Sequence, residues 1–134
     1  MGTLLGFDYG AAKIGIAVGQ TVTGTATPLA TLRAVGQRPD WAAIGRLIDE
    51  WQPEALVVGL PQDMDDSDTE VTAPARRFAR QLEGRFRLPV HMMDERLTSR
   101  EALQIAGYRP RAVEELDAIA ARLILETWLS EHAH

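Results

Sequence analysis

Acidic residues stand at the boundaries of three apolar segments that lie far apart in the sequence. Asp8 and the pair Asp94-Glu95 each follow a short apolar run, and Asp117 stands early in the last apolar segment. Carboxylates that lie close together repel one another unless a divalent cation neutralises them, and oxygen ligands favour Mg²⁺ or Mn²⁺ over zinc. Two such ions about 4 Å apart can hold the attacking and leaving oxygens of a phosphodiester. If the fold brings these acids together, they predict metal-assisted phosphodiester hydrolysis.

The simpler interpretation of Asp8 is that it forms a turn. Residues 4–7 form an apolar run too short for a helix, and an alternating run follows at 13–18, which predicts a β-hairpin. Aspartate is disfavoured inside strands and common in turns. Asp8 therefore either shapes this bend or holds a functional charge on a rigid strand, and acidic neighbours in the fold would decide between the two.

The elements needed to gather the acids follow from the hydrophobic pattern. It predicts strands over 4–8, 13–18, 23–32, 55–60 and 88–93, and helices over 41–51, 71–86, 98–106 and 114–130. Pro28 places the third strand at an edge, because proline cannot donate to a central ladder. The expected fold class is α/β, a mixed sheet of about five strands, the first three antiparallel, with helices on both faces.

Such a sheet would concentrate the acids at one edge. Ligands gather outside the carboxyl ends of parallel strands, where Asp8 and the pair Asp94-Glu95 would stand, and the last helix could lay Asp117 beside them. The acidic segment 63–68 lacks the central glycine and terminal glutamate of an EF-hand, so we expect a solvated loop there. His91, inside an apolar run, is expected to be packed or partly buried.

Composition indicates one globular domain over residues 1–134. Hydrophobic residues make up 46% of the chain and charged residues 25%, and cysteine is absent, which excludes disulfides and thiolate zinc sites. No apolar stretch approaches membrane-spanning length, and a cytoplasmic location is expected.

The charge of the chain limits how it could bind nucleic acid. A net charge of -5 argues against indiscriminate coating of nucleic acid, although a local basic face remains compatible with it. The densest basic cluster is Arg76, Arg77 and Arg80 on a predicted helix. It is either a solvated face or a phosphate contact.

Four stretches together resemble the YqgF/RuvX family of bacterial proteins, in the order and at the spacing of that family. The family is described as Holliday junction resolvases and as nucleases that process the 5′ end of pre-16S rRNA. The matching stretches are Asp8-Tyr9-Gly10 with Ile14-Gly15-Ile16-Ala17-Val18, Val57-Val58-Gly59-Leu60-Pro61 with Met64-Asp65, Asp94-Glu95-Arg96-Leu97-Thr98 with Glu101-Ala102, and Asp117 with Ala120-Ala121.

The resemblance implies an RNase H-like nuclease domain that uses Mg²⁺ or Mn²⁺. It implies that Asp8, Glu95 and Asp117 are the catalytic and metal-binding acids and that Asp94 is a supporting or alternative ligand. Nucleic-acid contacts are expected from Lys13, Arg96 and Thr98 and from the arginine cluster on the second helix. Gly10, Gly15, Gly59 and Pro61 are expected to shape the site. The family often has Lys-Arg where this chain has Ala12-Lys13.

The expected partner is nucleic acid, either structured RNA such as pre-16S rRNA or branched DNA, and ribosomal precursor particles are a further candidate. The sequence leaves open RNA or DNA, endonuclease or exonuclease action, and monomer or homodimer. One alternative is a non-catalytic nucleic-acid-binding or ribosome-associated factor that keeps the fold. A phosphotransferase of the actin and sugar-kinase type is disfavoured, because that fold needs two domains to enclose a nucleotide.

Overall fold

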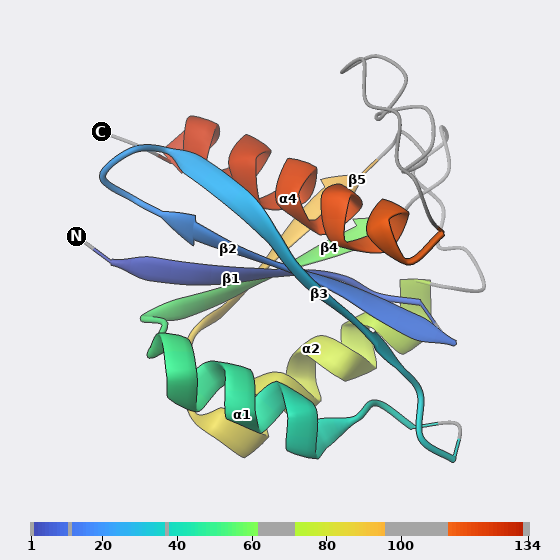
Figure 1. Ribbon diagram of the computed structural model, residues 1–134. Coiled ribbons are helices and arrows are strands. Elements are labelled where there is room, and N and C mark those ends of the chain that lie inside the picture. The colour runs from blue at the N-terminus through green and yellow to red at the C-terminus, as the bar shows by residue number, and fades with distance from the viewer. Residues whose placement is uncertain (1, 11, 37, 62–71, 96–112, 133–134) are drawn as a thin grey trace.

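The computed structural model describes residues 2–10, 12–36, 38–61, 72–95 and 113–132 (Figure 1). The elements are β1 (Thr3–Asp8), β2 (Lys13–Gln20), β3 (Thr25–Arg33), α1 (Trp41–Trp51), β4 (Ala55–Pro61), α2 (Thr72–Phe86), β5 (Val90–Glu95) and α4 (Val113–His132). The strands form one sheet in the order β3-β2-β1-β4-β5. β1, β2 and β3 are antiparallel neighbours, whereas β4 runs parallel to β1 and to β5. The predicted mixed sheet, with Pro28 on an edge strand, is confirmed.

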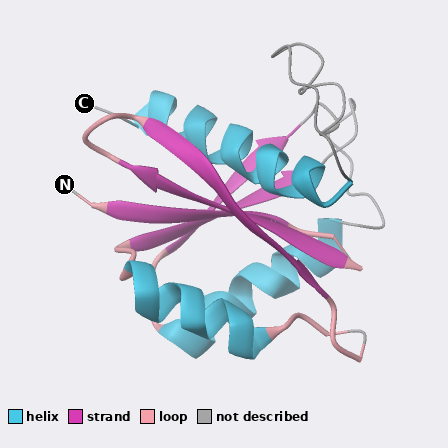
Figure 2. Cartoon of the chain, viewed as in Figure 1, coloured by secondary structure: helices cyan, strands magenta, loops and turns pink. Residues whose placement is uncertain are grey.

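Helices cover both faces of the sheet, α4 on one and α1 with α2 on the other (Figure 2). Alternation along the strands divides the core accordingly. Leu5 and Phe7 of β1 pack with α1 and α2, whereas Leu4 packs with α4. Each position of a strand can therefore be assigned to the α4 face or to the opposite face.

The first helix follows its sequence signals. Asp40 is the N-cap, and its side chain accepts a hydrogen bond from the backbone N–H of Ala43 at 3.1 Å. Trp41 and Trp51 are half-buried against the core, as expected of packing residues. Trp41 stacks on Phe78 of α2 at 5.5 Å between ring centroids, which ties the two helices of this face together.

Glycines let α4 lie directly on the sheet. A Cβ atom built on Gly6 of β1 would stand 2.8 Å from the Cβ of Leu125, and one on Gly19 of β2 would stand 2.8 Å from Cδ2 of the same leucine. Larger residues at either position would push the helix away. These two glycines thus fix the height of α4 above β1 and β2.

The last strand differs from the sequence prediction in its bounds. β5 begins at Val90 rather than at residue 88 and continues through Asp94 and Glu95, because its register with β4 runs from Leu56↔Val90 to Pro61↔Glu95. His91, expected to be packed or partly buried, is exposed because β5 is the outer strand of the sheet, and its ring packs against that of Trp128 at 4.9 Å between centroids.

Some predicted segments fall outside the described residues, namely the helix over 98–106 and the acidic loop over 63–68. Within the described part of the chain, no helix is long and apolar enough to cross a membrane.

Candidate functional site

Asp8 ends β1 at the carboxyl edge of the sheet, on the face that α4 covers. It pairs with Gly15 of β2 on one side and with Gly59 of β4 on the other. Neither neighbour contributes a side chain to this row, so the carboxylate of Asp8 stands between two positions of bare backbone. Asp8 is thus a half-buried residue at a strand end, with a glycine beside it on each neighbouring strand. An aspartate that only formed a turn would not need these two glycines.

The path of α4 brings position 117 over this row. Along α4, Leu129 lies over Gly19 of β2, which pairs with Leu4 at the beginning of β1, and Ala121 lies over Gly6 in the middle of β1, so the helix runs antiparallel to β1. Asp117 precedes Ala121 by four residues, a rise of about 6 Å along a helix. Asp8 follows Gly6 by two residues, about 6.6 Å along a strand. Because the two rises nearly match, we expect position 117 near the end of β1 that carries Asp8.

Strand alternation distinguishes the two adjacent acids of β5. Met93 packs with the α4 layer and Met92 with the opposite layer. Position 95 therefore falls on the α4 face, together with Asp8, and position 94 falls on the other face. The register puts Glu95 two strands away from β1 and two residues beyond the row of Asp8. In a sheet lattice this corresponds to roughly 12 Å between the Cα atoms of positions 8 and 95.

The donor set fits a hard divalent cation. Asp8, Glu95 and Asp117 would offer only carboxylate oxygens, which suit Mg²⁺ or Mn²⁺. The side chains of Asp94, Glu95 and Asp117 lie outside the described part of the structure, whereas their backbone positions in β5 and α4 are described. Among the side chains that the structure does describe, no group of three acids or histidines could hold a metal.

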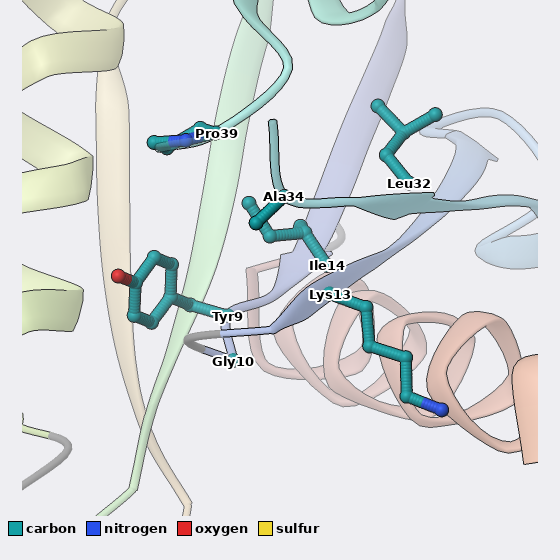
Figure 3. A pocket seen from close by; sticks show the side chains of 7 residues that line it. All are labelled: Tyr9, Gly10, Lys13, Ile14, Leu32, Ala34 and Pro39. Carbon is teal, nitrogen blue, oxygen red and sulfur yellow. The ribbon is translucent and has the colours of Figure 1, made fainter. Parts of the chain in front are cut away.

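The turn after Asp8 is tight and requires Gly10. A Cβ atom on Gly10 would stand 2.7 Å from the carbonyl oxygen of Lys13. A small hollow beside this turn is lined by Tyr9, Gly10, Lys13, Ile14, Leu32, Ala34 and Pro39 (Figure 3). Tyr9 packs against Phe78 at 5.1 Å between ring centroids, on the face opposite to Asp8. The predicted role of Gly10 in shaping the turn has a clear steric basis.

The structure separates the predicted basic residues. Lys13 begins β2 on the face of Asp8, because Ile14 belongs to the opposite core layer. The exposed cluster Arg76, Arg77 and Arg80 lies on α2, across the sheet. There Arg76 and Arg80 line an open groove with Glu83, Val90 and Met92. Arg96 and Thr98 lie outside the described residues.

An irregularity in β3 adds two residues to the α4 face that the sequence did not point to. The register between β2 and β3 shifts between Ile16 and Ala17, and beyond it Thr31 pairs with Gly15 and Arg33 with Lys13. Thr31 and Arg33 therefore share the α4 face with Asp8. The one signal in the sequence is Leu29 and Leu32, two large apolar residues three apart in a predicted strand, which breaks the alternation of period two.

The sheet order and the helix layers define an α/β fold of the RNase H-like class. Solved structures share this fold. RuvC of T. thermophilus in complex with a Holliday junction substrate aligns with a TM-score of 0.57 at 20% identity, covering 98% of this chain and 97% of that chain. The fowlpox virus Holliday junction resolvase aligns with a TM-score of 0.58 at 13% identity, covering 96% of this chain and 99% of that chain.

The chain belongs to the RuvX family, described as Holliday junction resolvase, whose model matches residues 2–131. A relative from Azotobacter vinelandii, named "Putative pre-16S rRNA nuclease", is 53% identical over 135 residues, which cover 96% of this chain and 93% of that protein. A relative of the same name from Legionella pneumophila is 49% identical over 134 residues, covering 97% and 96%. The family resemblance predicted from the four stretches is confirmed.

Proposed function

We propose that this protein is a metal-dependent nuclease that hydrolyses phosphodiester bonds in structured RNA such as the 5′ region of pre-16S rRNA, in branched DNA, or in both. The observation that carries the proposal is the strand register of Asp8 and Glu95 on the face covered by α4, the helix that contains Asp117. Support comes from strand pairing and alternation, which leave positions 8 and 95 on the face covered by α4, and from position 117 lying early in that helix. Acids from three distant parts of the chain have no structural reason to share that volume, since their charges repel.

The proposed roles follow from those positions. Asp8, Glu95 and Asp117 would hold Mg²⁺ or Mn²⁺, and the bound metal would supply charge neutralisation at the scissile phosphate and activation of a water. Asp8 is the central ligand, because it ends a strand that is paired on both sides and is therefore rigidly placed. Gly15 and Gly59 leave room beside it for a phosphate to approach.

Asp94 has a lesser role in this proposal. Its position on β5 falls on the face opposite to Asp8, so it would support the strand end rather than bind the shared metal. Arg96 and Thr98, which directly follow this strand in the sequence, are proposed to contact the substrate backbone. Pro61, paired with Glu95, is proposed to end β4 where the substrate enters.

The names of the relatives support nucleic acid as the substrate, and they support RNA and branched DNA equally. The curated relatives are named for pre-16S rRNA, and the family is described by the Holliday junction. Both substrates present folded nucleic acid with phosphates at defined places. The acidic edge of this chain would act on either by the same chemistry.

The test is cleavage of a labelled pre-16S rRNA 5′ fragment and of a four-way DNA junction with Mg²⁺ or Mn²⁺, comparing wild type with Asp8→Asn. We expect cleavage of at least one substrate by the wild type and a loss of at least about 100-fold in the variant. The exposed Asp49 on α1 provides a matched control, and Asp49→Asn should cut like the wild type. If the wild type cuts neither substrate, or if Asp8→Asn cuts equally well, the chain is a binding factor that has kept the fold.

A further inference from the structure

A β-bulge turns the outer strand β3 toward the candidate site. Opposite Ile16 and Ala17, the paired residues of β3 are Ala30 and Pro28, so Leu29 is an extra residue without a partner in the ladder. Leu29 and Leu32 both pack against the core layer of α1 and α2, although they are three positions apart. A regular strand would send two such residues to opposite faces. The bulge thus reverses the alternation of β3 for the rest of the strand.

The reversal puts a hydroxyl and a guanidinium on the face of Asp8. Thr31 stands in the same row as Gly15 and Asp8, two strands from the acid, or roughly 10 Å between Cα atoms. Arg33 follows Thr31 by two residues, so it lies on the same face, and it pairs with Lys13 of β2. Figure 3 shows Lys13 and Leu32 extending to different sides of the strand pair. Gly15 contributes no side chain between Thr31 and Asp8, so bare backbone separates them.

We propose that Lys13, Thr31 and Arg33 form a strip that binds the sugar-phosphate backbone of the substrate on the β3 side of the cleaved bond. The inference rests on the proposed nuclease function and names the surface along which the substrate strand lies. The strip carries two cations and a hydroxyl, groups that donate hydrogen bonds to phosphate oxygens. Arg33 is exposed and Lys13 is half-buried, so both can be approached from solvent.

The position of the strip favours it over the α2 cluster as the contact nearest the reaction. Arg76 and Arg80 line a groove on the other face of the sheet, with Val90 and Met92 as its apolar part. A nucleic-acid strand held at Asp8 on the α4 face would meet Lys13 on β2 and Arg33 on β3. The chain has a net charge of -5. Cations beside the acids therefore give an approaching polyanion its most favourable electrostatic interaction.

The experiment measures binding separately from cleavage. In the Asp8→Asn background, affinity for the labelled RNA fragment and for the DNA junction is measured by fluorescence anisotropy at several salt concentrations. Arg33→Gln should weaken binding about fivefold to tenfold and lower the slope of log K against log salt by about 1, whereas Arg33→Lys should retain most of both. Arg46→Gln on the surface of α1 removes the same charge elsewhere, and Arg80→Gln tests the α2 groove.

Equal small effects of Arg33→Gln and Arg46→Gln would overturn the inference, because net charge alone would then explain them. A larger effect of Arg80→Gln than of Arg33→Gln would also overturn it and place the substrate on the α2 face. Thermal melting of each variant verifies folding. Cleavage by the otherwise wild-type chain tests the proposed nuclease function independently of binding. A wrong assignment of the strip and a wrong assignment of the nuclease function therefore give different results.

Discussion

At the scale of single residues, the candidate site depends on which of two adjacent acids faces α4. Asp94 and Glu95 are adjacent in sequence, but alternation along β5 assigns them to opposite faces of the sheet. The spacing of the sequence identifies both as acids at a strand end without ranking them, and only the family resemblance implies Glu95. The packing of Met92 and Met93 on opposite layers sets the phase of the strand and independently favours Glu95.

This assignment predicts different outcomes for two conservative substitutions. Glu95→Gln should lower kcat for cleavage by at least about 100-fold, because residues that merely orient metal ligands already cost about 10- to 100-fold when they are changed. Asp94→Asn should stay within about 10-fold of the wild type. Single-turnover cleavage at saturating Mn²⁺ measures both rates. A deeper loss in Asp94→Asn than in Glu95→Gln would mean that the end of β5 is turned the other way.

At the scale of elements, the site depends on how closely α4 lies on β1. A methyl group at Gly6 would meet the Cβ of Leu125 at 2.8 Å and the carbonyl oxygen of Ala121 at 3.2 Å. The second contact is backbone, which cannot rotate away. Any side chain at Gly6 therefore moves the helix that carries Asp117.

We predict that Gly6→Ala destabilises the fold by about 1 to 3 kcal/mol and also lowers the cleavage rate of the protein that remains folded. Gly84→Ala in α2 is the matched control, because a Cβ atom there meets nothing within 4 Å. It should stabilise the protein by roughly 0.5 to 1 kcal/mol, since alanine is the better helix former. Urea unfolding and single-turnover cleavage test the pair, and an unchanged stability of Gly6→Ala would show that α4 can shift without cost.

The elements and the mixed sheet were largely predictable from the sequence, whereas the register between neighbouring strands was not. Apolar runs and Pro28 are local signals, so they indicate the strands and helices near their observed bounds. The bulge at Leu29 depends on register with a neighbouring strand, which no local pattern encodes. For the same reason the sequence does not single out Arg33. It points instead to the arginine cluster on α2 as a nucleic-acid contact, and this cluster lies on the other face of the sheet.

At the scale of the whole molecule, the proposed metal site couples to stability. The free chain would hold three carboxylates of like charge at one edge, in a molecule of net charge -5. Their repulsion disfavours the folded state until a cation binds. A ligand that binds only the folded state stabilises it by an amount set by its concentration relative to its dissociation constant.

Thermal melting should therefore report the metal without any substrate. At a Mn²⁺ concentration ten times its Kd, the wild type should gain about 1.4 kcal/mol, or roughly 3 to 6 °C in Tm for a chain of this size. Asp8→Asn should melt at or above the wild-type temperature in metal-free buffer, because one repelling charge is gone, and should gain little from Mn²⁺. Asp49→Asn on exposed α1 should respond to Mn²⁺ as the wild type does. An equal rise in all three proteins would mean that Mn²⁺ binds elsewhere, and a marked drop for Asp8→Asn without metal would make Asp8 a structural residue.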